Sequence, residues 1–289
     1  MPLILGLSRS WGGGQMKFGI DVINAGHFAD PKHAVELAQA AEASGWDGFF
    51  IWDHLAFIWG AASADLWVTL SAVAATTEKL IIGPAVTPVA RRRPQVLAQQ
   101  LVSLDLLSKG QVIFGAGLGG VAAEYTAFGQ PFEPKQVAAM LDEGLDVMAR
   151  LWAGAPVTHH GDHYRLENVS FQPRPVQQPR IPIWIGGESK PAMRRAARWD
   201  GWIIGISGPD GQITRTPQQL ADDIARIRAM RPDPDAPFDV AIIAQSEPGD
   251  RALAERFAQV GVSWWLESIH EMRARPDALL RRVEAGPPV

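Results

Sequence analysis

An apolar run that ends in an acid and an imidazole is the first feature whose residue types could do chemistry. Residues 48–54 read GFFIWDH, so Asp53 and His54 directly follow a segment that predicts a strand buried on both faces. In parallel α/β folds, the carboxyl ends of strands display catalytic side chains. An imidazole can exchange a proton near neutral pH. We therefore take Asp53 and His54 as catalytic candidates, with a capping acid and a structural histidine as the alternative.

A glycine-rich segment at residues 115–120, GAGLGG, fits the dinucleotide pattern G-x-G-x-x-G. We reject a Rossmann interpretation because that fingerprint opens a helix directly, whereas VAAEYTAFGQPFEP precedes the helix predicted from Pro134. The glycines, Gly117 among them, instead allow a sharp turn and a close approach of a flat ligand. Glu124 follows them and is a candidate for proton handling, or an ordinary exposed glutamate.

A second glycine-containing turn, IPIWIGGES, joins a predicted strand to a predicted helix. Gly186 and Gly187 would free backbone amides at the helix entrance, where unpaired N–H groups and the helix dipole favour an anion. With Glu188 and Ser189, they form a candidate phosphate seat. The alternative is that Ser189 only caps the helix.

The segment LIIGPAVTPVARRRP at residues 80–94 ends a predicted strand with small residues and continues into three arginines. Ala85 and Val86 could hold a backbone bend against a ligand ring. The arginines are interpreted as solvated charges at a helix entrance, or as contacts to an anionic tail.

The elements that position these motifs follow a regular pattern, in which short apolar runs alternate with longer amphipathic segments along the chain. Eight such pairs over a length near the typical ~250 residues predict a (β/α)8 TIM barrel, with a doubly wound sheet as the alternative. The predicted strands are Lys17–Val22, Gly48–Ile51, Leu80–Ile82, Gln111–Gly115, Ile181–Ile185, Gly201–Ile206, Asp239–Ala244 and Val262–Leu266. The predicted helices are Pro31–Ser44, Asp65–Thr77, Pro94–Ser108, Pro134–Leu151, Lys190–Trp199, Thr216–Met230, Asp250–Gln259 and His270–Val283.

Residues 156–182 break this alternation after the fourth helix. They predict a short surface hairpin, Val157–His160 and His163–Leu166, with a role in packing or partner contact. Its histidines do not indicate a metal site, because adjacent residues on a strand point to opposite faces and no further ligand cluster is nearby.

Composition narrows the class of protein. The chain has 289 residues, 47% of them hydrophobic, a net charge of -4 and no cysteine. Disulfides and thiolate chemistry are therefore excluded, and the charge gives no general attraction to nucleic acid or anionic membranes. No apolar run reaches the ~18 residues of a membrane span. We expect a cytoplasmic protein with an N-terminal extension, 1–15, before a single domain, 16–289.

Several motifs follow one another along the chain: FGI at 18–20, GWDGFFIWDH at 45–54, GPAVTP followed by RRRP, and LAQQLVSLDLLSKGQVIFGAGLG at 97–119. With RPVQQPRIPIWIGG and RRAARWDGW, they resemble the luciferase-like monooxygenase superfamily. The resemblance implies a (β/α)8 barrel that binds FMN or the deazaflavin coenzyme F420 at the carboxyl ends of its strands. It also implies that the cofactor phosphate lies near the GG turn, and that the protein is a homodimer.

Within that family, the Asp–His pair looks like that of deazaflavin-dependent members. The GPAVT segment resembles one that carries a non-proline cis peptide, which by position is Ala85–Val86, next to Thr87. Asp21 matches an acid that some deazaflavin reductases carry after strand one. In the sugar-phosphate dehydrogenase branch a tryptophan follows the histidine by four residues, where this chain has Ile58.

Three functions follow from the resemblance. The first is hydride transfer between F420 and a small organic substrate, in which His54 exchanges a proton, Asp53 orients it, and Asp21 and Glu124 are weaker candidates. The second is an FMN-dependent monooxygenase that uses O2 and flavin reduced by a partner flavin reductase. The third is a catalytically silent flavin-binding subunit. Three tryptophans near strand ends are expected to line the cavity: Trp52, Trp184 and Trp265.

Overall fold

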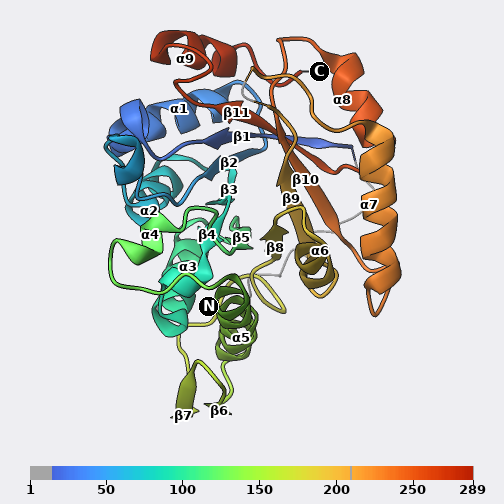
Figure 1. Cartoon of the computed structure of the whole chain (residues 1–289). Helices are drawn as coiled ribbons and strands as arrows, with labels where there is room; N and C mark the ends of the chain where they lie inside the picture. Colours follow the sequence, from blue (N-terminus) through green and yellow to red (C-terminus); the bar gives the residue numbers. More distant parts are fainter. Residues whose placement is uncertain (1–14, 209, 289) are drawn as a thin grey trace, which may run out of the picture.

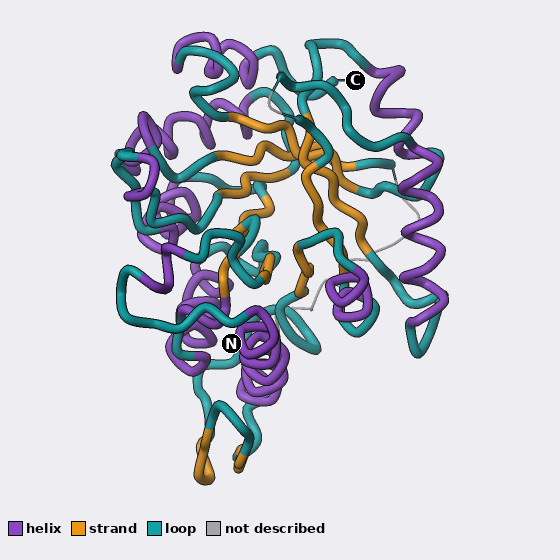
Figure 2. Tube along the Cα trace, in the orientation of Figure 1, coloured by secondary structure: helices purple, strands orange, loops and turns teal. Residues whose placement is uncertain are grey.

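The computed structural model describes residues 15–208 and 210–288, so the predicted N-terminal extension lies almost wholly outside the described residues. A ring of parallel strands stands at its centre, and helices cover the outside of the ring (Figures 1 and 2). The order of the strands in the ring is β3-β2-β1-β11-β10-β9-β8-β5-β4. Their bounds are β1 Lys17–Val22, β2 Gly48–Ile51, β3 Ile81–Pro84, β4 Thr87–Pro88, β5 Phe114–Gly117, β8 Ile183–Gly186, β9 Gly201–Gly205, β10 Asp239–Ala244 and β11 Trp264–Ile269.

The ring closes at the third predicted strand, Leu80–Ile82, which is present as β3 and is continued by a short strand that was not predicted, β4. The peptide bond Ala85–Val86 between them is cis, as the resemblance implied. Strand β4 pairs with β5, and a parallel bridge joins Ile82 to Val112 just before β5. With β3 and β4 counted as one strand, the predicted (β/α)8 barrel is confirmed.

The helices follow the strands as the sequence indicates, apart from details at their ends. They are α1 Pro31–Ala43, α2 Leu66–Thr76, α3 Pro94–Leu107, α4 Ala123–Thr126, α5 Pro134–Trp152, α6 Lys190–Ala196, α7 Pro217–Met230, α8 Arg251–Ala258 and α9 Pro276–Glu284. The short helix α4 was not predicted. The prediction that the last helix begins at His270 is wrong: residues 270–275 form a turn in which Arg273 donates to Glu267 (2.5 Å). Pro276 then occupies the first helical turn, where its missing N–H costs nothing.

Two apolar layers hold the barrel. The larger lies between the strands and the helices, and the smaller fills the inside of the ring. Inside, Phe50 stacks on Trp184 at 5.5 Å between ring centroids, and Trp264 meets both rings edge-on. The prediction that Trp184 and Trp265 line the cavity is wrong, because Trp184 belongs to this inner layer and Trp265 packs on Phe257 in the outer one. These three rings fill the inside of the barrel.

The predicted hairpin is present after α5 as β6 (Val157–His160) and β7 (Arg165–Val169), and it projects from the barrel in Figure 1. Its second strand begins and ends later than expected. Glu143 of α5 accepts hydrogen bonds from the backbone of His163 (3.0 Å) and Tyr164 (2.8 Å) and lies 2.8 Å from His159 Nε2. One carboxylate thus attaches the hairpin to the helix.

None of the helices in the described ranges is both long enough and apolar enough to cross a bilayer.

Candidate active site

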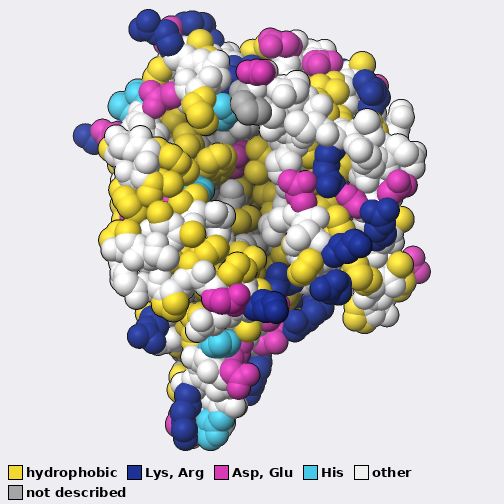
Figure 3. Space-filling view, in the orientation of Figure 1, with side chains coloured by type: hydrophobic (Ala, Val, Ile, Leu, Met, Phe, Trp, Pro, Cys, Tyr) yellow, Lys and Arg dark blue, Asp and Glu magenta, His cyan; other side chains and the backbone are white. Residues whose placement is uncertain are grey.

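A cavity of about 950 Å³ opens at the carboxyl ends of the strands, and Figure 3 shows it as the central hollow of that face. This volume is at the upper end of the range for small-molecule sites. Most of the predicted site residues line it: Asp53, His54, Ala85, Val86, Gly117, Gly186, Gly187, Glu188 and Ser189. Asp21, Thr87 and Glu124 do not line it, although each lies in the same region of the barrel.

His54 is held in place from two sides. Its backbone exchanges hydrogen bonds with the buried side chain of Asn24, whose Nδ2 donates to His54 O (2.8 Å) and whose Oδ1 accepts from His54 N (3.2 Å). Its ring Nδ1 lies 3.0 Å from Glu124 Oε1. Within the described part of the chain Nε2 forms no hydrogen bond, so this nitrogen is available to a ligand in the cavity.

Glu124 is buried behind His54. Its Oε1 also accepts from the backbone of Leu55 (2.8 Å) and Ala56 (3.3 Å), and its Oε2 pairs with Arg91. The interpretation of Glu124 as an exposed glutamate is therefore wrong. The expectation that Asp53 orients His54 is also wrong, because Glu124 makes the contact to the imidazole. Helix α4, which no periodicity indicated, carries this residue.

Asp53 forms ion pairs with two arginines instead. Arg92 donates through Nη2 to both carboxylate oxygens (2.8 Å each) and through Nε (3.1 Å), and Arg91 Nη2 lies 3.3 Å from Oδ1. The interpretation of these arginines as solvated charges or contacts to an anionic tail is wrong for both. They follow strand three, beside strand two in the ring, and that adjacency is the sequence signal that could have paired them with Asp53.

Asp21 lies beneath the cavity, fully buried near the end of β1. Its Oδ2 accepts a hydrogen bond from Trp52 Nε1 (2.7 Å), while Oδ1 has no partner. Burial raises the pKa of Asp21 well above the ordinary range, against the opposing effect of the Trp52 hydrogen bond. Trp52 lines the cavity with its ring centroid 5.5 Å from that of His54. Asp21 is thus placed to fix Trp52 rather than to meet a substrate.

One wall of the cavity is built from glycines packed against Val86. A Cβ added at Gly117 would lie 2.5 Å from Val86 Cγ2, and one at Gly186 would lie 3.0 Å from Val86 Cγ1. At Gly120 and Gly205 an added Cβ would meet open space. This wall has room for a planar ring system to lie close to the backbone.

The turn between β8 and α6 fits the predicted phosphate seat only in part. Gly187 has a φ of +116°, which a side chain rarely adopts, but its amide already donates to Ile203 O (3.3 Å). Ser189 caps α6 by accepting from Ala192 N (3.3 Å). The amides of Glu188 and Ser189 have no acceptor among the described residues, so an anion would have to bind these. Gly187 shapes the turn instead of donating.

The opposite wall contains residues that were not predicted. Gln245 follows β10, Ser268 lies near the end of β11 and His270 follows β11, where the rule of carboxyl strand ends could have found them. Gln245 Nε2 lies 3.4 Å from His270 Nε2, and His270 Nδ1 is buried without a partner. Burial lowers the pKa of His270, and the nearby Arg273 lowers it further. His270 is therefore an uncharged polar group in the wall.

Comparison with known proteins identifies the class. A sequence profile described as luciferase-like monooxygenase matches residues 13–281, so the chain belongs to this family.

Two relatives are F420-dependent glucose-6-phosphate dehydrogenases. The protein of Microbacterium testaceum is 31% identical over 73% of this chain and 64% of its own length. The protein of Nakamurella multipartita is 36% identical over 62% of this chain and 53% of its own length. The chain therefore spans about half to two thirds of these relatives. Among solved structures, an F420-dependent secondary alcohol dehydrogenase shares the fold with a TM-score of 0.76 and 19% identity, over 95% of this chain and 99% of that one.

Proposed function

We propose that the protein is an oxidoreductase that transfers a hydride between coenzyme F420 and a small organic substrate. The observation that carries the proposal is the placement of His54, whose Nε2 has no hydrogen-bond partner among the described residues and which lines the same cavity as the glycine wall. The names of the relatives support the deazaflavin over FMN. When bound, F420 supplies a ring carbon that accepts or donates hydride, chemistry that no side chain can provide.

The residues present fit such a group. The wall of Gly117 and Gly186 against Val86 would hold the planar ring, and Ala85, joined to Val86 by the cis peptide bond, lines the same cavity. The amides of Glu188 and Ser189, which have no acceptor in the described ranges, would hold its phosphate. Gly187, with its positive φ, lets the turn bring those amides to the cavity.

The remaining side chains divide the proton chemistry. His54 Nε2 would accept the proton of a substrate hydroxyl, or return one to a carbonyl oxygen. Glu124 would keep the imidazole oriented and stabilise its protonated form through the 3.0 Å contact to Nδ1. Asp53 would hold the loop through Arg91 and Arg92. We also propose that the enzyme works in the cytoplasm as a homodimer, as the family resemblance implies.

Titration of the purified protein with F420 and, separately, with FMN tests the cofactor assignment. Trp52 lines the cavity, so quenching of tryptophan fluorescence reports binding. We expect at least tenfold tighter binding of F420 than of FMN. Tighter binding of FMN would overturn the proposal and favour an FMN-dependent monooxygenase. Binding of F420 without turnover of any substrate would indicate a catalytically silent subunit.

A further inference from the structure

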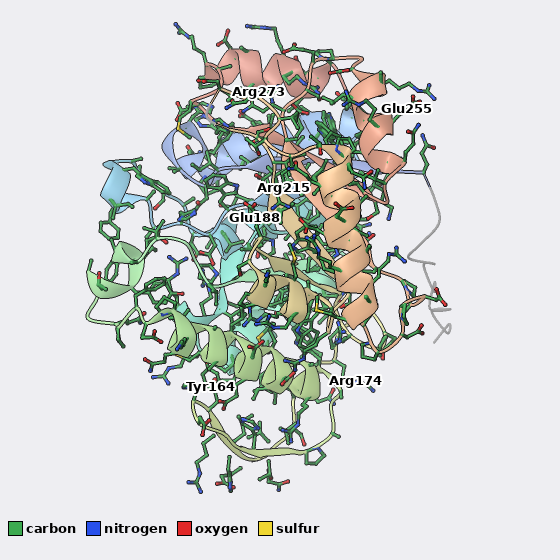
Figure 4. The ribbon with its side chains drawn as sticks, turned by 45° about the vertical axis from the view of Figure 1, so that its right-hand side comes forward. Tyr164, Arg174, Glu188, Arg215, Glu255 and Arg273 are labelled. Carbon is green, nitrogen blue, oxygen red and sulfur yellow. The ribbon has the colours of Figure 1, made fainter. Side chains whose placement is uncertain are left out.

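Among the described residues, the arginine side chains in and beside the cavity wall already have acidic partners. Arg195, buried and in the cavity wall, donates through Nε (2.6 Å) and Nη2 (2.8 Å) to the two carboxylate oxygens of Asp142. At the rim, Arg215 contacts Glu188 at 3.2 Å, and Figure 4 shows the two side chains pointing toward one another. A phosphate dianion needs such groups to replace its water shell, because burying an unpaired charge is strongly unfavourable.

The other ionisable groups of the wall do not supply a cation either. His270 faces Gln245 on one side, and it lies near Arg273, whose charge is matched by Glu267. Asp53 and Glu188 are themselves paired with Arg92 and Arg215, so these arginines are already matched by acids. A second anionic group, beyond the cofactor phosphate, finds no partner in the described part of the cavity.

The surface next to His54, outside the residues that line the cavity, is apolar and exposed. The ring of Trp59 lies 4.9 Å from that of His54 between centroids, and its side chain remains 48% exposed. Trp59 belongs to a short 3-10 turn, Phe57–Trp59, and Phe57 meets Phe128 of the loop after α4 edge-on at 5.6 Å. Figure 3 shows hydrophobic side chains gathered on this side of the hollow, where α2 and α4 lie in Figure 1.

This turn is held in a defined shape by its two ends. Ala56 and Gly60 both adopt the left-handed conformation, with φ of 56° and 64°. Phe57, Ile58, Trp59 and Phe128 are all exposed, and a contiguous exposed apolar patch is a recurring mark of a binding surface. The turn therefore presents Trp59 to whatever occupies the space beside His54.

Resting on the proposed function, we infer that the substrate is an uncharged alcohol, or the corresponding ketone, whose apolar body lies against Trp59, and that it is not a phosphorylated sugar. In the oxidative direction the carbon–hydrogen bond of the alcohol breaks and its hydride passes to oxidised F420. The hydroxyl proton passes to His54 Nε2, and the carbon–oxygen double bond forms. Atoms and electrons balance with no further reactant.

A matched pair of substrates isolates the effect of charge. We would compare 4-(1-hydroxyethyl)phenol with its phosphate ester at the phenolic oxygen, which leaves the secondary hydroxyl free to react. Both would be compared with glucose 6-phosphate, by the bleaching of oxidised F420. We expect the uncharged alcohol to show a kcat/KM at least tenfold above that of either phosphate. Equal or faster turnover of a phosphate, or no turnover of the alcohol by protein that binds F420, would overturn the inference while the cofactor assignment stands. Failure to bind F420 would overturn the proposed function itself.

Trp59 variants test the recognition surface independently. Trp59→Ala should raise the KM for the alcohol about tenfold and leave the affinity for F420 within twofold, and Trp59→Phe should restore most of the loss. Leu107→Ala, an exposed apolar residue at the far end of α3, serves as the control and should change neither. An unchanged KM for Trp59→Ala, with or without a changed oligomeric state, would overturn the assignment of this turn to substrate binding.

Discussion

His54 and Glu124, 70 positions apart in the chain, meet through a contact of 3.0 Å between Nδ1 and Oε1. The contact joins the loop after β2 to the helix after β5. It fixes which ring nitrogen faces the cavity. The orientation of the imidazole thus depends on Glu124, a residue that does not line the cavity.

His54→Ala should lower turnover by about 100-fold or more, the usual scale for a general acid or base. F420 affinity should stay within a few-fold of wild type, because His54 follows β2 whereas the proposed phosphate contacts follow β8. Steady-state kinetics paired with a binding titration measure the split. A raised KM with normal turnover would instead assign a positioning role to His54.

Glu124→Gln should act on both stability and catalysis. The amide can still accept from Leu55 N, but Arg91 loses a buried partner, and breaking a buried pair costs about 3 kcal/mol. Turnover should also fall, because the imidazolium formed when His54 takes a substrate proton loses its counter-charge. Urea denaturation and steady-state kinetics measure the two effects. A destabilised variant with unchanged turnover would show that Glu124 only holds the loops together.

Gly187→Val should weaken F420 binding about tenfold or more, because the residue adopts φ +116° and an added Cβ would lie 3.2 Å from Ala192 Cβ. Gly261→Val is the matched control: Gly261 also has a positive φ, +98°, but lies between α8 and β11, away from the carboxyl ends of the strands. Isothermal titration should show normal affinity for the control. Equal losses in both variants would indicate general strain and not a seat for the cofactor.

Asp21→Asn should stabilise the protein increasingly as the pH rises. Burial raises the pKa of Asp21 in the folded state, so the native protein holds a proton that the unfolded chain releases. The free energy of unfolding of the wild type therefore falls as the pH rises above the pKa of Asp21 in the unfolded chain. It falls by about 1.4 kcal/mol for each pH unit, until the pH passes the pKa of Asp21 in the folded protein. The neutral amide can still accept from Trp52 and removes that dependence. Urea denaturation from pH 4 to 8 checks this, and parallel curves for both proteins would contradict it.

The barrel itself was predictable because its apolar and amphipathic segments alternate along the whole chain. The strand ends also indicated the wall of the site from Asp53 to Ser189. What failed was the assignment of partners. Nothing in the spacing of Asp53, Glu124 and the arginines states which acid each cation meets, since the loops that carry them are shaped by contacts between distant segments. The start of the last helix failed for a similar reason, because the turn before Pro276 is set by the contact of Arg273 with Glu267.

The attachment of the β6–β7 hairpin through Glu143 has a practical consequence. The tip at residues 161–162 is exposed, and the hairpin follows a helix on the outside of the barrel, so it shares no residue with the cavity wall. A fluorescent reporter or an affinity peptide spliced between Gly161 and Asp162 would leave the cavity unobstructed. The hairpin is thus a suitable place to immobilise or label this protein.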